Sequence, residues 1–465
     1  MEKINAKIEE LKDSLIKDTQ EVLKIKSLEE DALPGMPYGE GVGKALEKAL
    51  EISKALGFKT VNLDGYVGYA EYGQGEDYIA VLGHLDVVPE GDGWKYPPYG
   101  AEIHDGKIYA RGAMDDKGPI MSALYGLKAV METGLPLSKR VRIIFGTNEE
   151  TGSAEIPYYN AREKAPAAGF TPDAQFPIIY AEKGLTIFDL VKTIGTKAKR
   201  NMEIMSLKGG QRPNMVPDYC EALIATDDPA NVISLLSEFK YENKQSDISY
   251  ERTDEGVLLK SYGVSAHGSL PELGKNAIMQ LLAFLGELPF EGTDIGDFIK
   301  FCNENIGMET DGKSFGVDLE DAASGKLSFN VGNIDLKEGV ITMSLNLRYP
   351  VTFKLEDMLT RLERKLLNTD IEIKNLDHQA PLYFPKEHPL IVSLQKVYKE
   401  QTGLEPELLA IGGGTYAKEM ENIVAFGPIF PGKPDLDHQA NEYIEIEDLV
   451  KCAKIYGAAI YELAK

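Results

Sequence analysis

The sequence is short of several residue types, and each scarcity excludes a class of protein. Its three cysteines, Cys220, Cys302 and Cys452, are odd in number and far apart in a chain of 465 residues. They can form neither a disulfide framework nor a Cys-x-x-Cys zinc knuckle, so we interpret them as inert thiols. No stretch approaches the roughly 18 uninterrupted apolar residues that cross a membrane. The N-terminal stretch MEKINAKIEELKDSL carries charges where a signal peptide needs an apolar core, and we therefore expect a cytoplasmic protein.

Positive charge is also scarce. Lys and Arg number 50 against 74 Asp and Glu, which gives a formal net charge of −24. This balance disfavours nucleic acid and anionic membrane surfaces as partners, and we expect neither. The remaining composition, 43% hydrophobic and 27% charged, is ordinary for a soluble globular protein. Because a single core rarely exceeds roughly 250–300 residues, we expect two domains.

One apolar stretch is distinguished by the polar residues that follow it. Tyr78–Gly83 has the composition of a strand buried on both faces, and it would present His84 and Asp86 at its carboxyl end. In open α/β sheets ligands bind at that edge. A His followed two residues later by an Asp indicates a metal ligand and the carboxylate that orients it. A core His with a satisfying partner explains this pair equally well.

The N-terminal part of the chain alternates between helical and strand-like patterns. Apolar residues recur at near-helical spacing around 4–16 and 45–52, and again at 118–132. A hairpin with Asp105-Gly106 as its turn precedes the last of these helices, and the buried strand Val141–Phe145 follows it. Alternation of this kind predicts an α/β domain with a sheet flanked by helices.

The pattern changes in the middle of the chain and then returns. Between 185 and 383 strand-like runs are mixed with helices, which predicts a separate α+β domain inserted into the first. From 384 onwards helix–strand alternation resumes and ends in a predicted helix at 446–464. The first domain would therefore be discontinuous, formed by residues 1–184 and 384–465.

Acidic and imidazole side chains gather in five short motifs, each in a loop expected at the carboxyl end of a strand. A single pair of acids on a loop is usually solvated, but together these motifs offer what a two-metal site needs. Two ions about 3.5–4 Å apart require a bridging carboxylate, further carboxylates and neutral imidazoles. Without a thiolate, such a set suits Zn²⁺, Mn²⁺ or Co²⁺. The motifs offer His84 and Asp86 (GHLD), Asp115 and Asp116 (ARGAMDDKG), Glu149 and Glu150 (GTNEETGS), Asp173 (TPDAQ) and His438 (DLDHQANE).

In combination, these motifs resemble those of the dinuclear metallopeptidase family that includes carboxypeptidase G, succinyl-diaminopimelate desuccinylase and the aminoacylases. Within that family the likeness is greatest to the bacterial Xaa-His dipeptidases of the PepV type. GHLDVVPEGDGW, GTNEETGS, GGGTYAKEM and the doubled length of the inserted domain carry the likeness over essentially the whole chain. The resemblance implies a catalytic metallopeptidase domain with a mixed sheet, and an inserted lid domain.

The resemblance also implies a set of metal ligands. Asp115 would bridge two divalent ions, with Zn²⁺ the expected metal and Mn²⁺ or Co²⁺ the alternatives. His84 and Asp173 would complete the first site, and Glu150 and His438 the second. An Asp at position 173 matches the dipeptidase and aminoacylase branches, whereas the desuccinylases usually carry a Glu there.

Two further acids receive roles by resemblance. Glu149 would be the general base that activates a metal-bridging water, and Asp86 would orient His84. The Asp115–Asp116 peptide bond is implied to be cis. His267 in the inserted domain would donate a hydrogen bond to the oxyanion of the tetrahedral intermediate.

Other residues of the inserted domain and the glycine loop would contact the substrate. Asn214 and Arg348 match lid positions that do so in the family. GGGTYAKEM looks like a glycine loop that opens a helix, and we expect Gly413, Gly414 and Thr415 to capture the C-terminal carboxylate of a peptide. A phosphate loop is the rival interpretation, but it lacks the Lys-Ser/Thr and the strand-GxGxxG frame.

We therefore expect a metal-dependent dipeptidase that acts on small peptides with a free N-terminus, of Xaa-His or broad specificity. An amidohydrolase of the same fold acting on N-acyl or N-succinyl amino acids is the alternative, and a non-catalytic metal-binding protein is a third. Glu149 speaks against the last, because a binding protein has no use for a free base beside the metals. The length of the lid implies a working monomer, and the metal-site carboxylates with Asp116 would meet the substrate's amino group.

Overall fold

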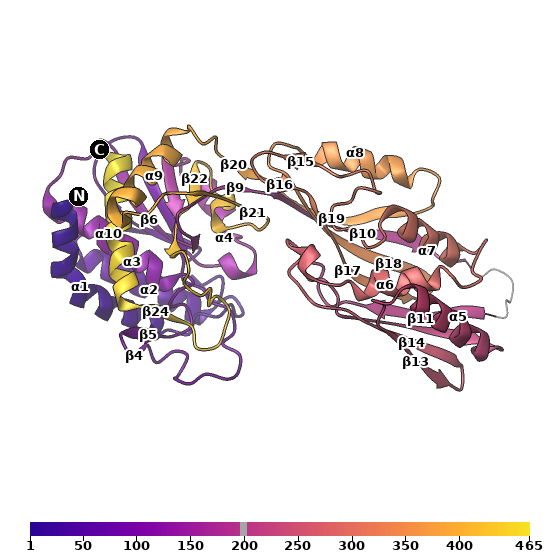
Figure 1. The fold of residues 1–465 in the computed structure, drawn as a ribbon. Helices are drawn as coiled ribbons and strands as arrows, with labels where there is room; N and C mark the ends of the chain where they lie inside the picture. The colour runs from indigo at the N-terminus through magenta and orange to yellow at the C-terminus, as the bar shows by residue number, and fades with distance from the viewer. Residues whose placement is uncertain (196–201) are drawn as a thin grey trace. The chain divides into compact units, whose positions relative to one another are not determined.

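The computed structural model describes residues 1–195 and 202–465, which form two compact units (Figure 1). Unit 1 comprises Met1–Tyr180, Phe384–Leu409 and Gly414–Lys465. Unit 2 comprises Ala181–Tyr383 and Ala410–Gly413. Among the described residues, none of the helices is both long and apolar enough to cross a membrane.

Unit 1 is built on a mixed sheet with the order β1-β2-β6-β3-β7-β22-β9. β3 runs parallel to β6 and β7, β22 runs parallel to β7, and the remaining pairs are antiparallel. Every residue of β3 is buried, as the sequence predicted for a strand covered on both faces. The strands are β1 (Lys59–Leu63), β2 (Val67–Tyr72), β3 (Tyr78–His84), β6 (Arg140–Gly146), β7 (Ala168–Thr171), β9 (Ile178–Glu182) and β22 (Ile423–Ala425).

Helices cover this sheet and bring distant parts of the chain together. α3 and α10 pack against β3 and β6, and α2 packs against β1 and β2. α3 and α10 approach so closely that a Cβ on Gly126 would lie 2.7 Å from the backbone nitrogen of Gly457, so position 126 leaves no room for a side chain. The helices are α1 (Glu2–Leu23), α2 (Glu40–Ala55), α3 (Lys117–Thr133), α4 (Glu155–Asn160), α9 (Pro389–Thr402) and α10 (Ile446–Ala464).

Several short strands accompany the main sheet. Asp105 and Gly106 both have positive φ at the turn between β4 and β5, as a two-residue type I′ hairpin requires. The last two residues of β9 belong to unit 2, where β20 pairs with them. The short strands are β4 (Glu102–His104), β5 (Lys107–Tyr109) and β24 (Tyr443–Glu445) in one sheet, β8 (Ala174–Gln175) with β23 (Pro428–Ile429), and β20 (Leu382–Tyr383) and β21 (Leu408–Ile411).

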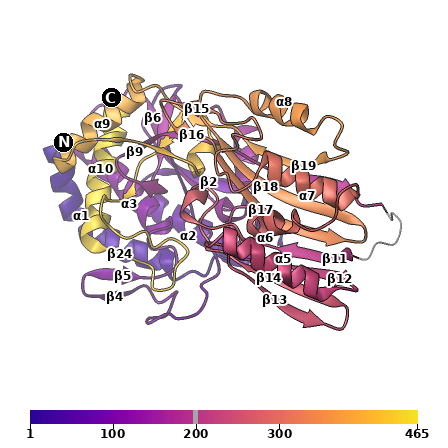
Figure 2. The same cartoon turned by 45° about the vertical axis from the view of Figure 1, so that its right-hand side comes forward.

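The described residues of unit 2 form an antiparallel sheet accompanied by the helices α5 to α8 (Figure 2). Burial alternates along β10, so one face of that strand enters a core that includes Phe188 and Leu190. The sheet order is β13-β14-β12-β11-β17-β18-β10-β19. Its strands are β10 (Gly184–Thr193), β11 (Met202–Gly209), β12 (Tyr219–Thr226), β13 (Ile248–Thr253), β14 (Gly256–Tyr262), β17 (Ser328–Lys337), β18 (Val340–Tyr349) and β19 (Glu372–Gln379). β15 (Glu320–Asp321) pairs with β16 (Gly325–Lys326), and the helices are α5 (Pro229–Glu242), α6 (Ala277–Leu285), α7 (Asp294–Asn305) and α8 (Leu355–Leu366).

The predicted fold class, a mixed α/β sheet flanked by helices with an inserted α+β unit, is confirmed. One local prediction is wrong. The glycine loop opens only a single 3₁₀ turn, η3 (Tyr416–Glu419), because Met420 is already extended. The predicted domain boundaries at 184/185 and 383/384 stay a prediction, and residues 196–201 of the expected lid lie outside the described residues.

Candidate metal centre

The parallel strands of unit 1 deliver three of the candidate ligands to one edge of the sheet. His84 is the last residue of β3, and Asp173 lies two residues beyond β7. Glu149 and Glu150 begin the 3₁₀ turn η1 (Glu149–Thr151), which follows β6. Because β3, β6 and β7 are parallel, their carboxyl ends meet at this edge, as expected for an α/β ligand site.

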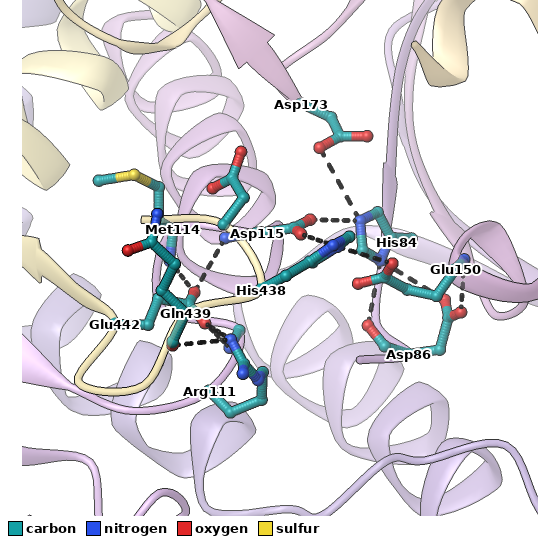
Figure 3. A network of polar contacts seen from close by, with 12 residues as sticks. His84, Asp86, Arg111, Met114, Asp115, Glu150, Asp173, His438, Gln439 and Glu442 are labelled. Atoms are coloured by element: carbon teal, nitrogen blue, oxygen red, sulfur yellow. Dashed lines mark hydrogen bonds and ion pairs between the residues drawn. The ribbon is translucent and has the colours of Figure 1, made fainter. Parts of the chain in front are cut away.

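Two ligands come from other segments. Asp115 lies just before α3, and the peptide bond between Asp115 and Asp116 is cis, as the resemblance implied. His438 lies in the loop before β24 and has a positive φ of 62°. Figure 3 shows both side chains directed toward His84.

Asp115 lies between the two imidazoles. Its Oδ1 is 2.9 Å from Nε2 of His84, and its Oδ2 is 3.2 Å from Nε2 of His438. On the His84 side, Asp173 Oδ1 is 3.9 Å from the same Nε2 (Figure 3). On the other side, Glu150 Oε2 is 3.0 Å from Nε2 of His438. The structure therefore brings together all five predicted ligands, in two groups that share Asp115.

Glu149 lies within this cluster. One ligand atom each from His84, Glu149 and Asp173 fall within 4.8 Å of one another, and the same holds for His84, Asp115 and Glu150. Glu149 is thus close enough to the first group to serve either as a ligand or as a base. Distance alone does not separate these two roles.

The cluster concentrates negative charge in a buried place. Burial, followed by the charge of Asp173, holds the pKa of Glu149 well above its usual value. Burial also raises the pKa of Asp173 to about 7. On the other side, hydrogen bonds to Asp115 and Glu150 raise the pKa of His438 to about 11. Oε1 of Glu150 is buried without a hydrogen-bond partner among the described residues.

These residues fit a pair of divalent cations. The donors are two imidazole nitrogens and several carboxylate oxygens, which suit borderline and hard metal ions. Asp115 offers one oxygen to each side, as a bridging ligand must. Bound cations would also compensate the carboxylates whose charged forms burial disfavours.

Asp86 contacts both the His84 ring and the backbone of the two neighbouring acids. Its backbone oxygen is 3.0 Å from Nδ1 of His84, and its Oδ1 lies farther from the same nitrogen, at 3.5 Å. The same carboxylate accepts hydrogen bonds from the backbone N–H groups of Glu149 at 3.3 Å and Glu150 at 3.1 Å. Asp86 therefore fixes the imidazole and the two neighbouring acids together.

Sequence reasoning missed Glu442, a fully buried carboxylate that holds the Asp115 loop. It accepts hydrogen bonds from the backbone N–H groups of Met114 at 2.8 Å and Asp115 at 3.2 Å, and from Arg111 Nη1 at 2.8 Å (Figure 3). Burial raises the pKa of Glu442 to about 7. The residue lies within the DHQANE motif, but an acid in a loop carries no sequence signal that it is buried.

A second missed carboxylate holds the loop after β6. Oε1 of Glu155 accepts hydrogen bonds from the backbone N–H groups of Thr147 and Asn148, both at 3.3 Å, and from the Tyr416 hydroxyl. Burial raises the pKa of Glu155 to about 7. Tyr416 follows the glycine loop directly, so that loop is tied to the segment that carries Glu149.

Asp116 cannot meet a substrate amino group, and this expectation was wrong. The residue is fully buried, and its Oδ2 accepts a hydrogen bond of 3.1 Å from the backbone N–H of His84. Burial and the nearby charge of Asp173 hold the pKa of Asp116 well above its usual value. The paired acids of the motif thus differ, because one turns toward the ligands and the other toward the backbone of β3.

Unit 2 brings most of its own predicted residues together. The backbone N–H of Gly268, next to His267, donates to the carbonyl of Asn214 at 2.7 Å. Arg348 Nη1 donates to the carbonyl of Gly412 at 2.7 Å, and a Cβ on Gly413 would lie 3.8 Å from the same nitrogen. Among the described residues no carboxylate pairs with Arg348, and burial lowers the pKa of its guanidinium to about 10.

The glycine loop is divided between the units. Gly413 belongs to unit 2, whereas Gly414 and Thr415 belong to unit 1. Oγ1 of Thr415 caps η3 by accepting from the N–H of Ala417 at 3.2 Å. A four-residue turn lacks the aligned peptide dipoles of a long helix, so the anion site cannot rest on a helix N-terminus.

The sheet edge and its shared carboxylate define a metal-dependent hydrolase of the two-metal class. The chain belongs to peptidase family M20/M25/M40, which matches residues 80–462. The protein is accordingly a metallopeptidase, and the family resemblance seen in its motifs is confirmed.

Relatives match over nearly the full length of the chain. A Bacillus subtilis protein named "Putative dipeptidase YtjP" is 44% identical over 461 residues, which cover 98% of both chains. A "Putative dipeptidase" of Staphylococcus epidermidis is 37% identical, again over 98% of both chains. Among solved structures, aminoacylhistidine dipeptidase from Vibrio alginolyticus has a TM-score of 0.59 at 12% identity, with 97% of this chain and 96% of that chain covered. That likeness shows the fold alone.

Proposed function

We propose that the protein is a dipeptidase that hydrolyses dipeptides with a free N-terminus. One observation carries the chemistry, namely the Asp115 carboxylate that places one oxygen against each of two imidazoles at the edge of the sheet. The substrate class is supported by the names of two relatives that are 44% and 37% identical over 98% of this chain.

The proposed cofactor is a pair of divalent ions, with Zn²⁺ as the resident metal. Asp115 would bridge them, with His84 and Asp173 on one ion and Glu150 and His438 on the other. Bound there, the ions would polarise the scissile carbonyl and make water a nucleophile near neutral pH. Asp86 keeps His84 oriented, because it contacts Nδ1 and leaves Nε2 for coordination.

Glu149 is the proposed general base. It takes the proton from the attacking water and delivers it to the leaving amino group. Its main chain is held by the Asp86 carboxylate and its side chain lies within reach of the His84 group. A base fixed in this way can act twice in one turnover without rearrangement of the loop.

Unit 2 supplies the proposed substrate contacts. His267 would donate a hydrogen bond to the developing oxyanion, with Asn214 beside it. Arg348, a buried guanidinium that pairs with no carboxylate of the described residues, would bind the C-terminal carboxylate of the peptide. The backbone of Gly413 and Gly414 and the hydroxyl of Thr415 would complete that anion site.

We further propose that the enzyme works as a monomer in the cytoplasm. The length of unit 2 supports the first proposal. By resemblance, a lid of this length has a second half that can take the place of a partner subunit. The three buried free thiols support the second, since they suit a reducing compartment. Sedimentation of the purified protein at several concentrations tests the proposed monomeric state. An obligate dimer would refute that proposal.

A substrate panel tests the function. The protein is stripped of metal, reloaded with Zn²⁺, Mn²⁺ or Co²⁺, and assayed on dipeptides, tripeptides and N-acyl amino acids. Hydrolysis of dipeptides only in reloaded samples supports the proposal, and the metal that restores the highest rate tests the choice of Zn²⁺. Preferential hydrolysis of N-acyl amino acids would replace the dipeptidase with an amidohydrolase. Full activity in a demonstrably metal-free sample would overturn the two-metal mechanism.

A further inference from the structure

The imidazole of His267 has a defined hydrogen-bond partner within unit 2. Its Nδ1 lies 2.7 Å from Oγ of Ser269 and also accepts a hydrogen bond from the backbone N–H of Ser269 at 3.4 Å. A backbone N–H can only donate, so Nδ1 must offer its lone pair. The single N–H of the neutral ring is therefore on Nε2, and the Ser269 hydroxyl is the second donor to Nδ1.

Ser269 is itself held in place by several segments of unit 2. Ser328 Oγ, on β17, donates to the carbonyl of Ser269 at 2.9 Å. A Cβ on Gly412 would lie 2.9 Å from Cβ of Ser269, so the glycine allows the two segments to approach. The N–H of Leu270 donates to the carbonyl of His267 at 2.9 Å, which closes the turn between the two residues.

We propose that Ser269 is a positioning residue that fixes His267 as the neutral tautomer with its proton on Nε2. This inference rests on the proposed function, because only that tautomer presents an N–H donor on Nε2 to an oxyanion. The surroundings favour a neutral ring. Partial burial, followed by the charge of Arg348, lowers the pKa of His267 below its usual value. Ser269 therefore selects which nitrogen carries the proton of a ring that is already neutral.

Nuclear magnetic resonance reports the tautomer directly. The zinc-loaded full chain is labelled with ¹⁵N in its six histidines, and the His267→Gln variant identifies the ring of His267. Long-range ¹H–¹⁵N correlations at neutral pH should show a protonated Nε2 and a hydrogen-bonded, unprotonated Nδ1. In Ser269→Ala only the longer bond from the backbone N–H remains. The Nδ1 resonance should therefore move toward that of a free acceptor, and the Nδ1–H tautomer should become partly populated.

Ser328→Ala is the matched control. It removes a hydroxyl on β17 and so loosens the carbonyl of Ser269, but it leaves the Ser269 hydroxyl that faces the ring. The ring resonances should stay as in the parent protein. A shift of equal size in both variants would mean that Ser269 acts only through the backbone, and a protonated Nδ1 in the parent protein would overturn the inference.

Kinetics separates this inference from the proposed function. A lost orienting hydrogen bond should lower kcat of Ser269→Ala by up to about tenfold, with KM unchanged and both metals retained. If the ring resonances shift as expected but neither Ser269→Ala nor His267→Gln loses activity, the oxyanion role fails and the tautomer assignment stands. If His267→Gln loses activity and the resonances of Ser269→Ala do not move, the tautomer inference fails and the oxyanion role stands.

Discussion

At the scale of single residues, Glu149 and Glu150 are adjacent acids with different surroundings. Glu150 contacts His438, whereas Glu149 lies near His84 and Asp173. Glu149→Ala should lose roughly 10²–10⁴-fold in kcat, the usual contribution of a general base, and still bind two metals. Glu150→Ala should lose one equivalent of metal. The test measures the metal content of each dialysed variant together with its steady-state kinetics. An equal loss of metal from both variants would show that Glu149 is a ligand.

His267 tests whether unit 2 takes part in the chemistry. Removal of one oxyanion donor typically costs about 10²–10³-fold in kcat. His267→Ala should show such a loss with its metal content unchanged, because the residue belongs to a different unit from the ligands. His388→Ala is a matched control, since that histidine caps α9 in unit 1. An unchanged kcat in His267→Ala would limit unit 2 to substrate binding.

A substitution of Glu442 should weaken metal binding without changing any of the proposed ligands. Its two oxygens hold the N–H groups of Met114 and Asp115 and the guanidinium of Arg111. Glu442→Gln keeps the shape but replaces one acceptor with a donor that faces these groups. We expect a loss of metal affinity of about 10–100-fold, the usual cost of changing a group that supports a ligand. Glu445→Gln, on the neighbouring strand but paired with Lys433, should bind metal normally.

At the scale of elements, β2 and β6 are joined by a charged network that should set the stability in acid. Glu71 on β2 accepts from Arg140 Nη1 at 2.9 Å and from Arg142 Nε at 2.8 Å, both on β6. Burial alone would raise the pKa of Glu71, but the hydrogen bond and charge of Arg142 outweigh it and hold the pKa below its usual value. A carboxyl with a lowered pKa in the folded state stabilises that state above its unfolded pKa of about 4.3.

This stabilisation should therefore be lost as pH falls from about 4.3 through the lower pKa of folded Glu71. In the metal-free protein, Glu71→Gln should reduce the free energy of unfolding at neutral pH and flatten its acid dependence. Denaturant titrations at a series of pH values measure this, and Glu51→Gln in an exposed pair on α2 is the control. If the free energy of unfolding of Glu71→Gln fell with pH as steeply as that of the parent protein, other carboxyl groups would dominate acid unfolding.

Local patterns predicted the elements well where a single strand or helix decides the outcome. The fully buried β3 and the Asp105-Gly106 hairpin are examples, because burial on two faces and a positive φ leave direct marks on the sequence. The ligand assignments rest on the family resemblance of the motifs, and the structure brings the five side chains together at one edge of the sheet. Asp116, Glu155 and Glu442 could not be assigned, since their burial depends on segments distant in the chain. The helix predicted after the glycine loop was wrong, because a 3₁₀ turn and the start of an α-helix share the same first residues.

At the scale of the whole molecule, substrate length is the property to measure. The proposed dipeptidase would bind the C-terminal carboxylate of its substrate through Arg348 and the glycine loop, and it would accept one residue after the scissile bond. Dipeptides should therefore be hydrolysed, tripeptides slowly or not at all, and proteins not. Amidation of the C-terminus should reduce kcat/KM strongly, because it removes the charge that Arg348 binds. A tripeptide that turns over as fast as a dipeptide would refute this arrangement.

The position of β22 within the sheet of unit 1 has a consequence for biosynthesis. This strand lies between β7 and β9, yet it is made only after the whole of unit 2. A ribosome adds roughly 5–20 residues per second, so a gap in the sheet persists for many seconds while residues 183–422 are synthesised. His438 and Glu442 emerge later still. The nascent chain therefore carries its earliest ligands long before it can hold a metal pair, and only a polypeptide that already includes His438 and Glu442 can become an active peptidase.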